Sequence, residues 1–470
     1  MGTFRNILPD EFSNFTITDK SYSLLIKGLP GTGKSSLALE LIARSPNAFF
    51  ISTRIDPEAI IEDASWLDEI FPEDRKYPFF MDATRSGKVS KNKSIQKMNF
   101  ETIPEFVQQL FTLGSDLPHR IFVIDSWNAV IGNLSETQIH HWESAIVQRV
   151  QGKNDKIIFV VEGIKDSTLD WMVDGHAILS KRSIVSSHGI SRRIRELSFP
   201  KMRGIEIYNE TYLTTLAKGR MKTFPPFKYR FPAILLKSKT IPDSDEQHIS
   251  SGSVDFDNLL GGGFQKGSYN LFEVSTIVGD GLDIILFPLI TNHLNNKRAL
   301  ISILREGITF DTKKPYFDVF TGNKNWVKQS MNFERFVPGE ESHRITLPET
   351  IEGLLNRIEN IKDDFRKDNG QTILINIGLD VLENMYGIPA LNEFMAILVS
   401  KARLEGDVVV GWLKENQEYR GGTTAATSHW KIDLINRALV LEGIIPATEY
   451  FAIESVLVKG YIDYTITPVL

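Results

Sequence analysis

The sequence predicts an α/β protein with two tandem domains, each built around a central, mainly parallel sheet. Three observations support this prediction. Short apolar runs alternate with helical stretches, as expected of β-α-β units. A phosphate-loop motif at Gly28–Ser35 lies between such a run and a helical stretch. The pattern of the first half then recurs after residue 249, which indicates an internal repeat.

The loop GLPGTGKS matches the pattern G-x-x-x-x-G-K-[ST] at every position. The apolar run 22–27 before it predicts a buried strand, and residues 36–43 predict a helix. Glycines let successive N–H groups point at phosphate oxygens, and the helix N-terminus adds positive charge. The loop therefore predicts a nucleoside triphosphate site rather than a chance glycine-rich turn. The expected contacts come from Gly28, Pro30, Gly31, Thr32, Gly33, Lys34, Ser35 and Ser36.

Within this loop, Lys34 is expected to reach the β- and γ-phosphates and Ser35 to ligate Mg²⁺. A second acidic ligand follows the apolar run 121–124, which ends in Asp125. A strand covered on both faces is apolar throughout, and its last side chain emerges beside the phosphate loop. Asp125 is therefore the expected holder of the Mg²⁺ shell, with ATP and Mg²⁺ as the cofactors.

The remaining elements of the first half alternate in the same way. The pattern predicts strands at 47–53 and at 156–161, the latter ending in Glu162, helices at about 57–71 and 102–113, and a polar surface loop at 87–97. Residues 181–203 carry seven basic side chains: Lys181, Arg182, Arg192, Arg193, Arg195, Lys201 and Arg203. They form either a solvated hairpin or a surface that reaches a phosphate on a neighbouring subunit or on nucleic acid.

The second half begins after a proline-rich and acidic stretch. We expect a first domain over 1–224, a linker over 225–248 and a second domain over 249–470. Where a phosphate loop should follow the strand predicted at 267–274, the chain has no Lys-Ser or Lys-Thr pair, and Asp280 would repel a triphosphate. The later strand at 372–376 ends in Asn376 in place of the carboxylate. The second domain is thus expected to keep the fold and to lose the nucleotide site.

Composition limits the remaining function classes. The net charge of −6 argues against a general nucleic-acid footprint. The absence of cysteine excludes disulfides and thiolate metal sites, and it fits a reducing cytoplasm. No apolar run approaches the ~20 residues of a membrane-spanning helix, and the first residues lack the pattern of a signal peptide. We therefore expect a cytoplasmic protein with no membrane span.

Four segments carry a resemblance to a known family: the 28–35 loop, Val123–Ser126, the Lys-Met-Arg-Gly run at 201–204, and the entry to the second half at 254–263. The chain resembles the KaiC/GvpD/RadA group of RecA-type ATPases, and its start is most similar to archaeal GvpD-like proteins. The resemblance implies a RecA-like core in each half. It also implies a homo-oligomer, hexameric rings included, in which Lys201 and Arg203 would contact the γ-phosphate of the neighbouring subunit.

One departure from the family bears on catalysis. KaiC-like proteins place paired glutamates after the second strand to activate water, whereas this chain has Arg54 and Ile55 there. Loss of a general base costs ~10²–10⁴-fold in rate. Glu162 is the first candidate for a replacement base, before Asp56 and Glu58, although a purely structural role is an equal alternative. Arg54 is a candidate for direct phosphate contact, which would favour binding over turnover.

Several functions follow from these expectations. The favoured one is an ATP-binding regulatory protein with slow or absent hydrolysis, whose second half is a docking or oligomerisation module for an unidentified protein partner. The alternative is an active ATPase with a relocated catalytic carboxylate. An autokinase is disfavoured because the second half lacks its own site. A DNA-acting recombinase is disfavoured by the net charge, and a passive scaffold by the complete phosphate loop.

Overall fold

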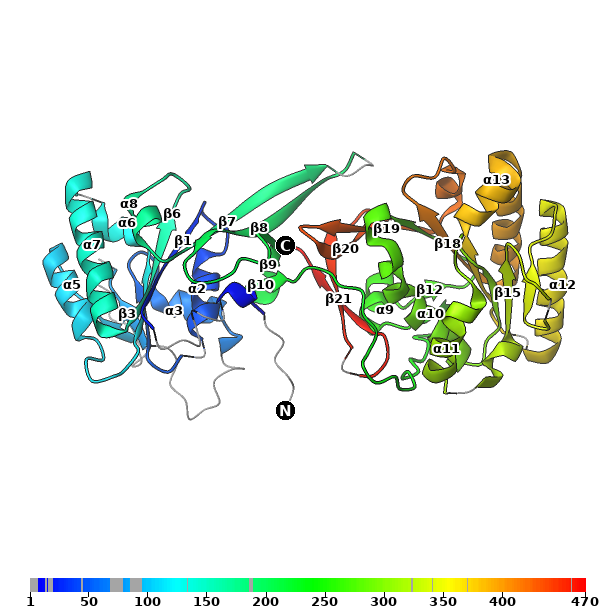
Figure 1. The fold of residues 1–470 in the computed structure, drawn as a ribbon, viewed down its shortest axis with the longest axis horizontal. Helices are drawn as coiled ribbons and strands as arrows, with labels where there is room; N and C mark the ends of the chain where they lie inside the picture. Colours follow the sequence, from blue (N-terminus) through cyan, green and yellow to red (C-terminus); the bar gives the residue numbers. More distant parts are fainter. Residues whose placement is uncertain are drawn as a thin grey trace. The chain divides into compact units, whose positions relative to one another are not determined.

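The computed structural model describes residues 7–12, 15, 20–43, 45–67, 79–84, 95–132, 134–185, 189–322, 324–339, 341–369, 371–457 and 459–470. The chain divides into two compact units (Figure 1). The first holds Met1–Pro226 together with Val469–Leu470, and the second holds Phe227–Pro468. Each unit is an α/β structure around its own sheet, as the sequence predicts.

The described residues of the first unit form one ten-stranded sheet in the order β10-β9-β8-β7-β1-β6-β5-β2-β3-β4. Strands β7 to β4 of this order run parallel, and β8, β9 and β10 are antiparallel additions. The strands are β1 Tyr22–Gly28, β2 Ala48–Ser52, β3 Phe79–Asp82, β4 Ile95–Lys97, β5 Ile121–Asp125, β6 Lys156–Glu162, β7 Gly175–Val185, β8 Ser191–Met202, β9 Thr211–Thr215 and β10 Lys222–Phe224.

Helices cover both faces of this sheet. Apolar side chains of α2 and α3 pack with Leu24 and Ile26 on one face, and those of α5 and α7 pack with Leu25 on the other. This alternation along β1 is why its whole run is apolar. The helices are η1 Asp10–Phe12, α2 Lys34–Ile42, α3 Pro57–Asp63, α5 Ile103–Thr112, α6 Trp127–Ile131, α7 Glu136–Lys153, α8 Thr168–Met172 and η2 Ala217–Gly219.

Two local predictions for the first unit need correction. The helix expected at about 57–71 ends at Asp63, because the chain leaves helical geometry at Ala64, whose φ/ψ is −103/44; residues 68–71 lie outside the described part. The loop expected at 87–97 ends in a short strand, β4, which pairs with the edge of β3. Pairing with β3 satisfies its backbone groups despite the polar sequence. Residues 87–94 lie outside the described part.

The second unit repeats the topology. Its described residues form a ten-stranded sheet in the order β22-β21-β20-β19-β13-β18-β17-β14-β15-β16, with a separate β11–β12 pair. The strands are β11 His248–Ile249, β12 Phe264–Gln265, β13 Tyr269–Val274, β14 Leu300–Ile303, β15 Ser330–Glu334, β16 Arg344–Thr346, β17 Leu374–Gly378, β18 Val408–Lys414, β19 Ser428–Ile435, β20 Ala438–Ile445, β21 Tyr450–Ser455 and β22 Tyr464–Pro468.

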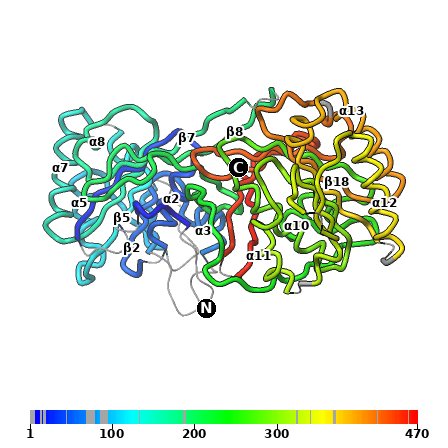
Figure 2. The backbone as a smooth tube through the Cα atoms, turned by 45° about the vertical axis from the view of Figure 1, so that its right-hand side comes forward, coloured from blue at the N-terminus to red at the C-terminus, as the bar shows by residue number. Residues whose placement is uncertain are grey.

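The helices of the second unit again form two layers (Figure 2). Side chains of α10 and α11 pack on one face of the sheet, and those of α12 and α13 on the other. The helices are α9 Val254–Leu260, η3 Thr276–Leu282, α10 Asp283–Asn295, α11 Phe310–Phe320, η4 Lys324–Gln329, α12 Ile351–Asn369, α13 Leu379–Glu405 and η5 Gly421–Ala425.

One helical stretch of the described residues, Thr276–Asn295, has the length and mean hydropathy of a membrane span. Buried residues make up 78% of its most apolar window. Leu289 and Phe287 of α10 belong to the apolar cluster that packs on the sheet. Their place in that cluster identifies the stretch as the core helix of the second unit.

The segment between the two sheets packs against the second unit. Residues 225–247 contain no helix or strand. Phe231 stacks on Tyr316 of α11 with ring centroids 4.0 Å apart, and the Tyr229 hydroxyl donates to Asp283 of α10 at 2.9 Å. This part of the chain is therefore held by the core of the second unit along much of its length.

Candidate nucleotide-binding site

The phosphate loop joins β1 to α2 in the first unit. Gly33 is the residue before α2, and its φ of 102° lies in a region that favours glycine. A Cβ at Gly33 would also lie 2.6 Å from Cε of Met221. Gly31 has a φ of 71°, and a Cβ at Gly28 would lie 2.5 Å from the Leu179 carbonyl oxygen. Gly31 and Gly33 thus adopt backbone angles that other residues rarely take, and Gly28 and Gly33 leave no room for a side chain.

Lys34 begins α2 and is buried. Its ammonium group donates a hydrogen bond of 3.0 Å to the Leu29 carbonyl oxygen, and the Thr32 hydroxyl donates to the same oxygen at 2.8 Å. Burial lowers the pKa of Lys34, while the carboxylates of Glu162 and Asp125 oppose this change. A phosphate bound in the loop would add further negative charge and favour the charged ammonium.

Asp125 ends β5 beside the loop, as predicted from the sequence. Its carboxylate accepts a hydrogen bond from the Ser35 hydroxyl, and its Oδ2 atom is buried without a hydrogen-bond partner among the described residues. Burial raises the pKa of Asp125. A hydroxyl and a carboxylate with a spare oxygen suit a hard cation such as Mg²⁺, which keeps several ligand positions for water and phosphate. The two side chains therefore fit the predicted metal ligands.

Arg54 and Glu162 form an ion pair across the carboxyl ends of β2 and β6. A side-chain hydrogen bond holds the end of β6 in place: the Glu162 backbone N–H donates to the Asn128 side-chain oxygen at 2.7 Å. Glu162, the candidate base, is thus already paired with Arg54, which occupies the position of a glutamate in KaiC-like proteins. Asp56 serves as the N-cap of α3, where its carboxylate accepts from the Glu58 N–H at 3.0 Å. Glu58 lies in the first turn of that helix.

Two basic side chains of the β7–β8 hairpin lie at the phosphate loop of their own unit. Arg195 Nη1 donates to the Gly31 carbonyl oxygen at 2.7 Å, and Lys181 Nζ lies 3.3 Å from where a Gly31 Cβ would be. Arg195 Nε also donates to the Leu470 carbonyl oxygen at 2.6 Å. The sequence places these residues in the basic cluster but gives no sign that they are nearest the loop. Only the register between β1 and β7 reveals it.

Lys201 and Arg203 lie at the opposite end of the same hairpin. Lys201 Nζ donates to the Trp171 carbonyl oxygen at 3.1 Å, and Arg203 pairs with Asp174 at 3.1 Å. Lys201 lies near the end of β8, where it pairs with His176 near the start of β7, and Arg203 follows the strand; both are away from Gly28 at the other end of β1. They therefore do not join the site of their own unit.

The structure brings most of the predicted site together. Lys34, Ser35 and Asp125 share one charged cluster with Arg54 and Glu162. Pro30 and Gly31 are exposed in the loop, Thr32 is buried against Leu29, and Ser36 lies in the first turn of α2. Among the described residues, no group of three or more His, Asp or Glu side chains could hold a metal by itself. A metal here would depend on phosphate oxygens as well.

The corresponding part of the second unit carries other side chains. Strand pairing shows that Gly378, and not Asn376, occupies the position of Asp125. Asp125 ends β5 and pairs with Val160 of β6. Gly378 ends β17 and pairs with Trp412, the residue of β18 that corresponds to Val160. The prediction for Asn376 is wrong because the apolar run extends two residues further than its pattern indicates. Asn376 instead lies inside the sheet and accepts from the Trp412 indole at 2.6 Å. Asp280 lies in η3, which replaces the loop.

The fold and the loop together define a RecA-type P-loop protein, with a nucleotide-binding domain in the first unit and a repeat of its fold in the second. Residues 12–199 match the family model described as "GvpD gas vesicle protein, P-loop domain". The first unit is therefore similar to the P-loop domain of GvpD, and the resemblance to GvpD-like proteins that the sequence indicated is confirmed.

Two proteins of Halobacterium salinarum are similar to the chain. GvpD1 is 25% identical over 331 residues, which cover 64% of this chain and 57% of GvpD1. GvpD2 is 23% identical over 482 residues, which cover 95% of this chain and 93% of GvpD2. The similarity to GvpD2 thus extends through both units, whereas the match to GvpD1 spans little more than half of that protein.

Proposed function

We propose that this protein is an ATP-binding regulator of the GvpD kind, which holds Mg-ATP in its first unit and hydrolyses it slowly or not at all. The observation that carries the proposal is the pairing of Glu162 with Arg54 beside a complete phosphate loop. Lys34, Ser35 and Asp125 can bind Mg-ATP, but the nearest candidate base is held by a guanidinium. Attacking water would then be poorly oriented, and its proton would lack an acceptor.

In this proposal the bound nucleotide regulates the protein, and its hydrolysis does not drive mechanical or chemical work. The second unit is a docking or oligomerisation module for an unidentified protein partner in an archaeal cytoplasm. The similarity to GvpD proteins supports a role connected with gas vesicles. Nucleic acid is a less favoured partner, because two of the basic side chains of the hairpin already face the phosphate loop.

The test measures ADP formation and nucleotide-induced stabilisation on the same protein. ATP at about 100 times its dissociation constant should raise the free energy of unfolding by about 2.7 kcal/mol. For a regulator, this shift appears in the wild type and in Glu162→Gln and disappears in Lys34→Ala, while ADP exceeds the level of Lys34→Ala by at most a few turnovers over hours. ADP formation over many turnovers would contradict the proposal.

An active ATPase is the second candidate, and the exposure of the ion pair favours it. The Arg54 and Glu162 side chains are 50% and 35% exposed, and exposed pairs contribute only about 0–1 kcal/mol. The γ-phosphate could therefore displace Glu162 from Arg54 and leave the carboxylate free to accept a proton. In that case Glu162→Gln lowers turnover by about 10²–10⁴-fold and keeps the ATP-induced shift.

Assembly adds a further element to the proposal. Lys201 and Arg203 lie away from the loop of their own unit, which supports their expected contact with a γ-phosphate of a neighbouring subunit. Lys201→Ala and Arg203→Ala should therefore reduce only assembly-dependent ATPase activity. Activity assays across a dilution series, with sedimentation to follow assembly, would show an equal loss in the monomer if this role is wrong.

A further inference from the structure

A hollow of about 350 Å³ lies at the carboxyl ends of β13, β14 and β18 in the second unit. This is the end of the sheet that holds the phosphate loop in the first unit. The volume falls within the range of about 300–1,000 Å³ that is usual for small-molecule sites. Residues of η3 line one side, and Arg305, Ile308 and Trp412 line the other.

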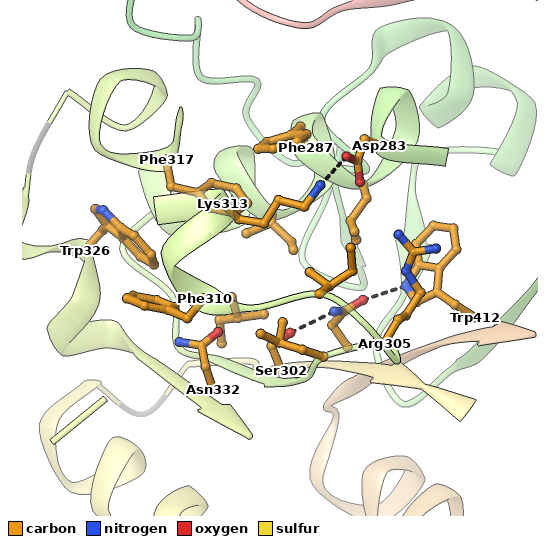
Figure 3. A pocket seen from close by; sticks show the side chains of 16 residues that line it. Asp283, Phe287, Ser302, Arg305, Phe310, Lys313, Phe317, Trp326, Asn332 and Trp412 are labelled. Carbon is orange, nitrogen blue, oxygen red and sulfur yellow. Dashed lines mark hydrogen bonds and ion pairs between the residues drawn. The ribbon is translucent and has the colours of Figure 1, made fainter. Parts of the chain in front are cut away.

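Arg305, Ile308 and Trp412 also line a second, inner cavity of about 40 Å³. Figure 3 shows Phe310, Phe317 and Trp326 on one side of this cavity and Trp412 with Arg305 on the other. Its space suits a small apolar group, since one water needs about 10–15 Å³. The outer hollow and the inner cavity thus lie next to each other and share these three residues. The inner cavity is lined mainly by apolar side chains, and its charged groups, Lys313 and Asp283, are paired with each other.

Arg305 takes the place that the metal-ligating carboxylate has in the first unit. A Cβ on Gly378 would lie 2.7 Å from the Arg305 Cα and 2.8 Å from its Cγ. Gly378 is the counterpart of Asp125, so the missing side chain makes room for the arginine. Arg305 therefore brings a positive charge to the end of the sheet at which the first unit has Asp125.

The other charges at the mouth are largely paired. Glu306 forms an ion pair of 2.8 Å with Arg335, and Lys414 forms one of 2.6 Å with Asp380. Within the described part of the chain, Arg305 forms no ion pair. Asp280 lies exposed at the rim and disfavours a ligand with several negative charges.

We propose that this pocket binds a small organic anion with one acidic head group and an apolar end. Arg305 would hold the carboxylate or monophosphate head through charge-assisted hydrogen bonds. The apolar end would lie along Trp412, whose indole N–H is fixed by Asn376 at 2.6 Å, and Ile308, toward the inner cavity. The second unit would then be a sensor of a metabolite, distinct from the nucleotide site of the first.

The test uses the full chain with Lys34→Ala, so that the first unit does not bind added nucleotide. Calorimetric titration with 3-phenylpropionate should show one site, and 3-phenylpropylamine, which reverses the charge, should show none. Arg305→Gln should weaken the acid's binding by at least about tenfold. Arg305→Lys should retain part of it. Arg357→Gln on the exposed face of α12 is the matched control and should leave binding unchanged.

Gly378→Ala tests the same geometry without removing the charge. The added methyl group would displace Arg305, so binding of the acid should fall while the far-ultraviolet spectrum stays that of the parent protein. Four results would overturn the proposal: no binding of the acid, equal binding of the amine, no effect of Arg305→Gln, or Mg-ATP binding to the Lys34→Ala chain that Arg305→Gln abolishes. Failure of ATP binding in the wild type would leave these results unaffected, so the two proposals fail separately.

Discussion

The two units share one strand order but differ in the side chains at the carboxyl ends of their central strands. The first unit has Lys34 at the start of α2 and Asp125 at the end of β5. In the second, Asp280 lies in η3 and Gly378 ends β17. The sheet core is set by apolar packing on both faces, which tolerates any of these residues at its edge. Fold and chemistry can therefore diverge within one chain.

The sharpest test of this comparison is a pair of substitutions in the two loops. Lys34→Ala should remove the ATP-induced stabilisation, about 2.7 kcal/mol at 100 times the dissociation constant, because Lys34 is the loop residue expected to contact the β- and γ-phosphates. Asp280→Ala, its counterpart in η3, should leave the shift intact. Thermal melts with and without Mg-ATP measure both. A shift that survives Lys34→Ala would place the nucleotide elsewhere.

Arg54→Gln tests the pairing of Arg54 with Glu162, which has no counterpart in the glutamate pair of KaiC-like proteins. If Arg54 contacts phosphate, its loss should weaken ATP binding by about tenfold or more, since hydrogen bonds to charged groups contribute roughly 1.5–3 kcal/mol. Titration of ATP in the presence of Mg²⁺ measures the change. Arg335→Gln, which breaks the Arg335–Glu306 pair of the second unit, is the control. Unchanged affinity in Arg54→Gln would limit Arg54 to holding Glu162.

Gly33→Ala and Gly279→Ala compare the two loop backbones. Gly33 has a φ of 102° and a crowded Cβ position, so alanine should lower the free energy of unfolding by about 1–3 kcal/mol. Gly279 has a φ/ψ of 54/−127°, which favours glycine, but nothing lies within 4 Å of its Cβ position. Alanine there should therefore cost backbone strain alone, about 1–3 kcal/mol, without the added contact present at Gly33. Urea unfolding measures both. Equal losses would show that backbone strain, and not the contact with Met221, decides the cost.

Asp125→Asn tests the electrostatic cost of keeping a metal ligand buried. Burial raises the pKa of Asp125. A folded-state pKa above the unfolded one means that the native state binds the extra proton, so stability falls as pH rises from the unfolded pKa through the folded one. Without Mg²⁺ and nucleotide, the variant should therefore be more stable at pH 7 by about 0.5–2 kcal/mol. The gain should vanish at acidic pH, where the carboxyl is protonated in both states.

Urea unfolding across this pH range, without Mg²⁺ or nucleotide, measures the effect. The same variant should lose the Mg²⁺-dependent part of ATP binding, because the amide cannot replace a carboxylate toward the metal. A loss of stability that is equal at every pH would mean that the hydrogen bond from Ser35, rather than burial of the charge, dominates at this position.

Contiguous patterns allowed much of the first unit's site to be predicted. The loop at 28–35 and the run that ends in Asp125 each place their side chains through a single strand and its continuation, so spacing in the sequence is enough. The Arg54–Glu162 pair and the approach of Arg195 to Gly31 were not predictable in this way. Both depend on which strands lie next to each other and in which register.

The two repeated α/β units, the phosphate loop and the loss of lysine in its counterpart could be predicted without a structure. These features rest on local chain geometry and on apolar periodicity, which the order of residues states directly. Three features became visible only in the folded chain: Glu162 is paired, the hairpin reaches its own loop, and Arg305 lies against Gly378. Such contacts arise from strand register across long sequence separations, where a shift of one residue turns every side chain to the other face.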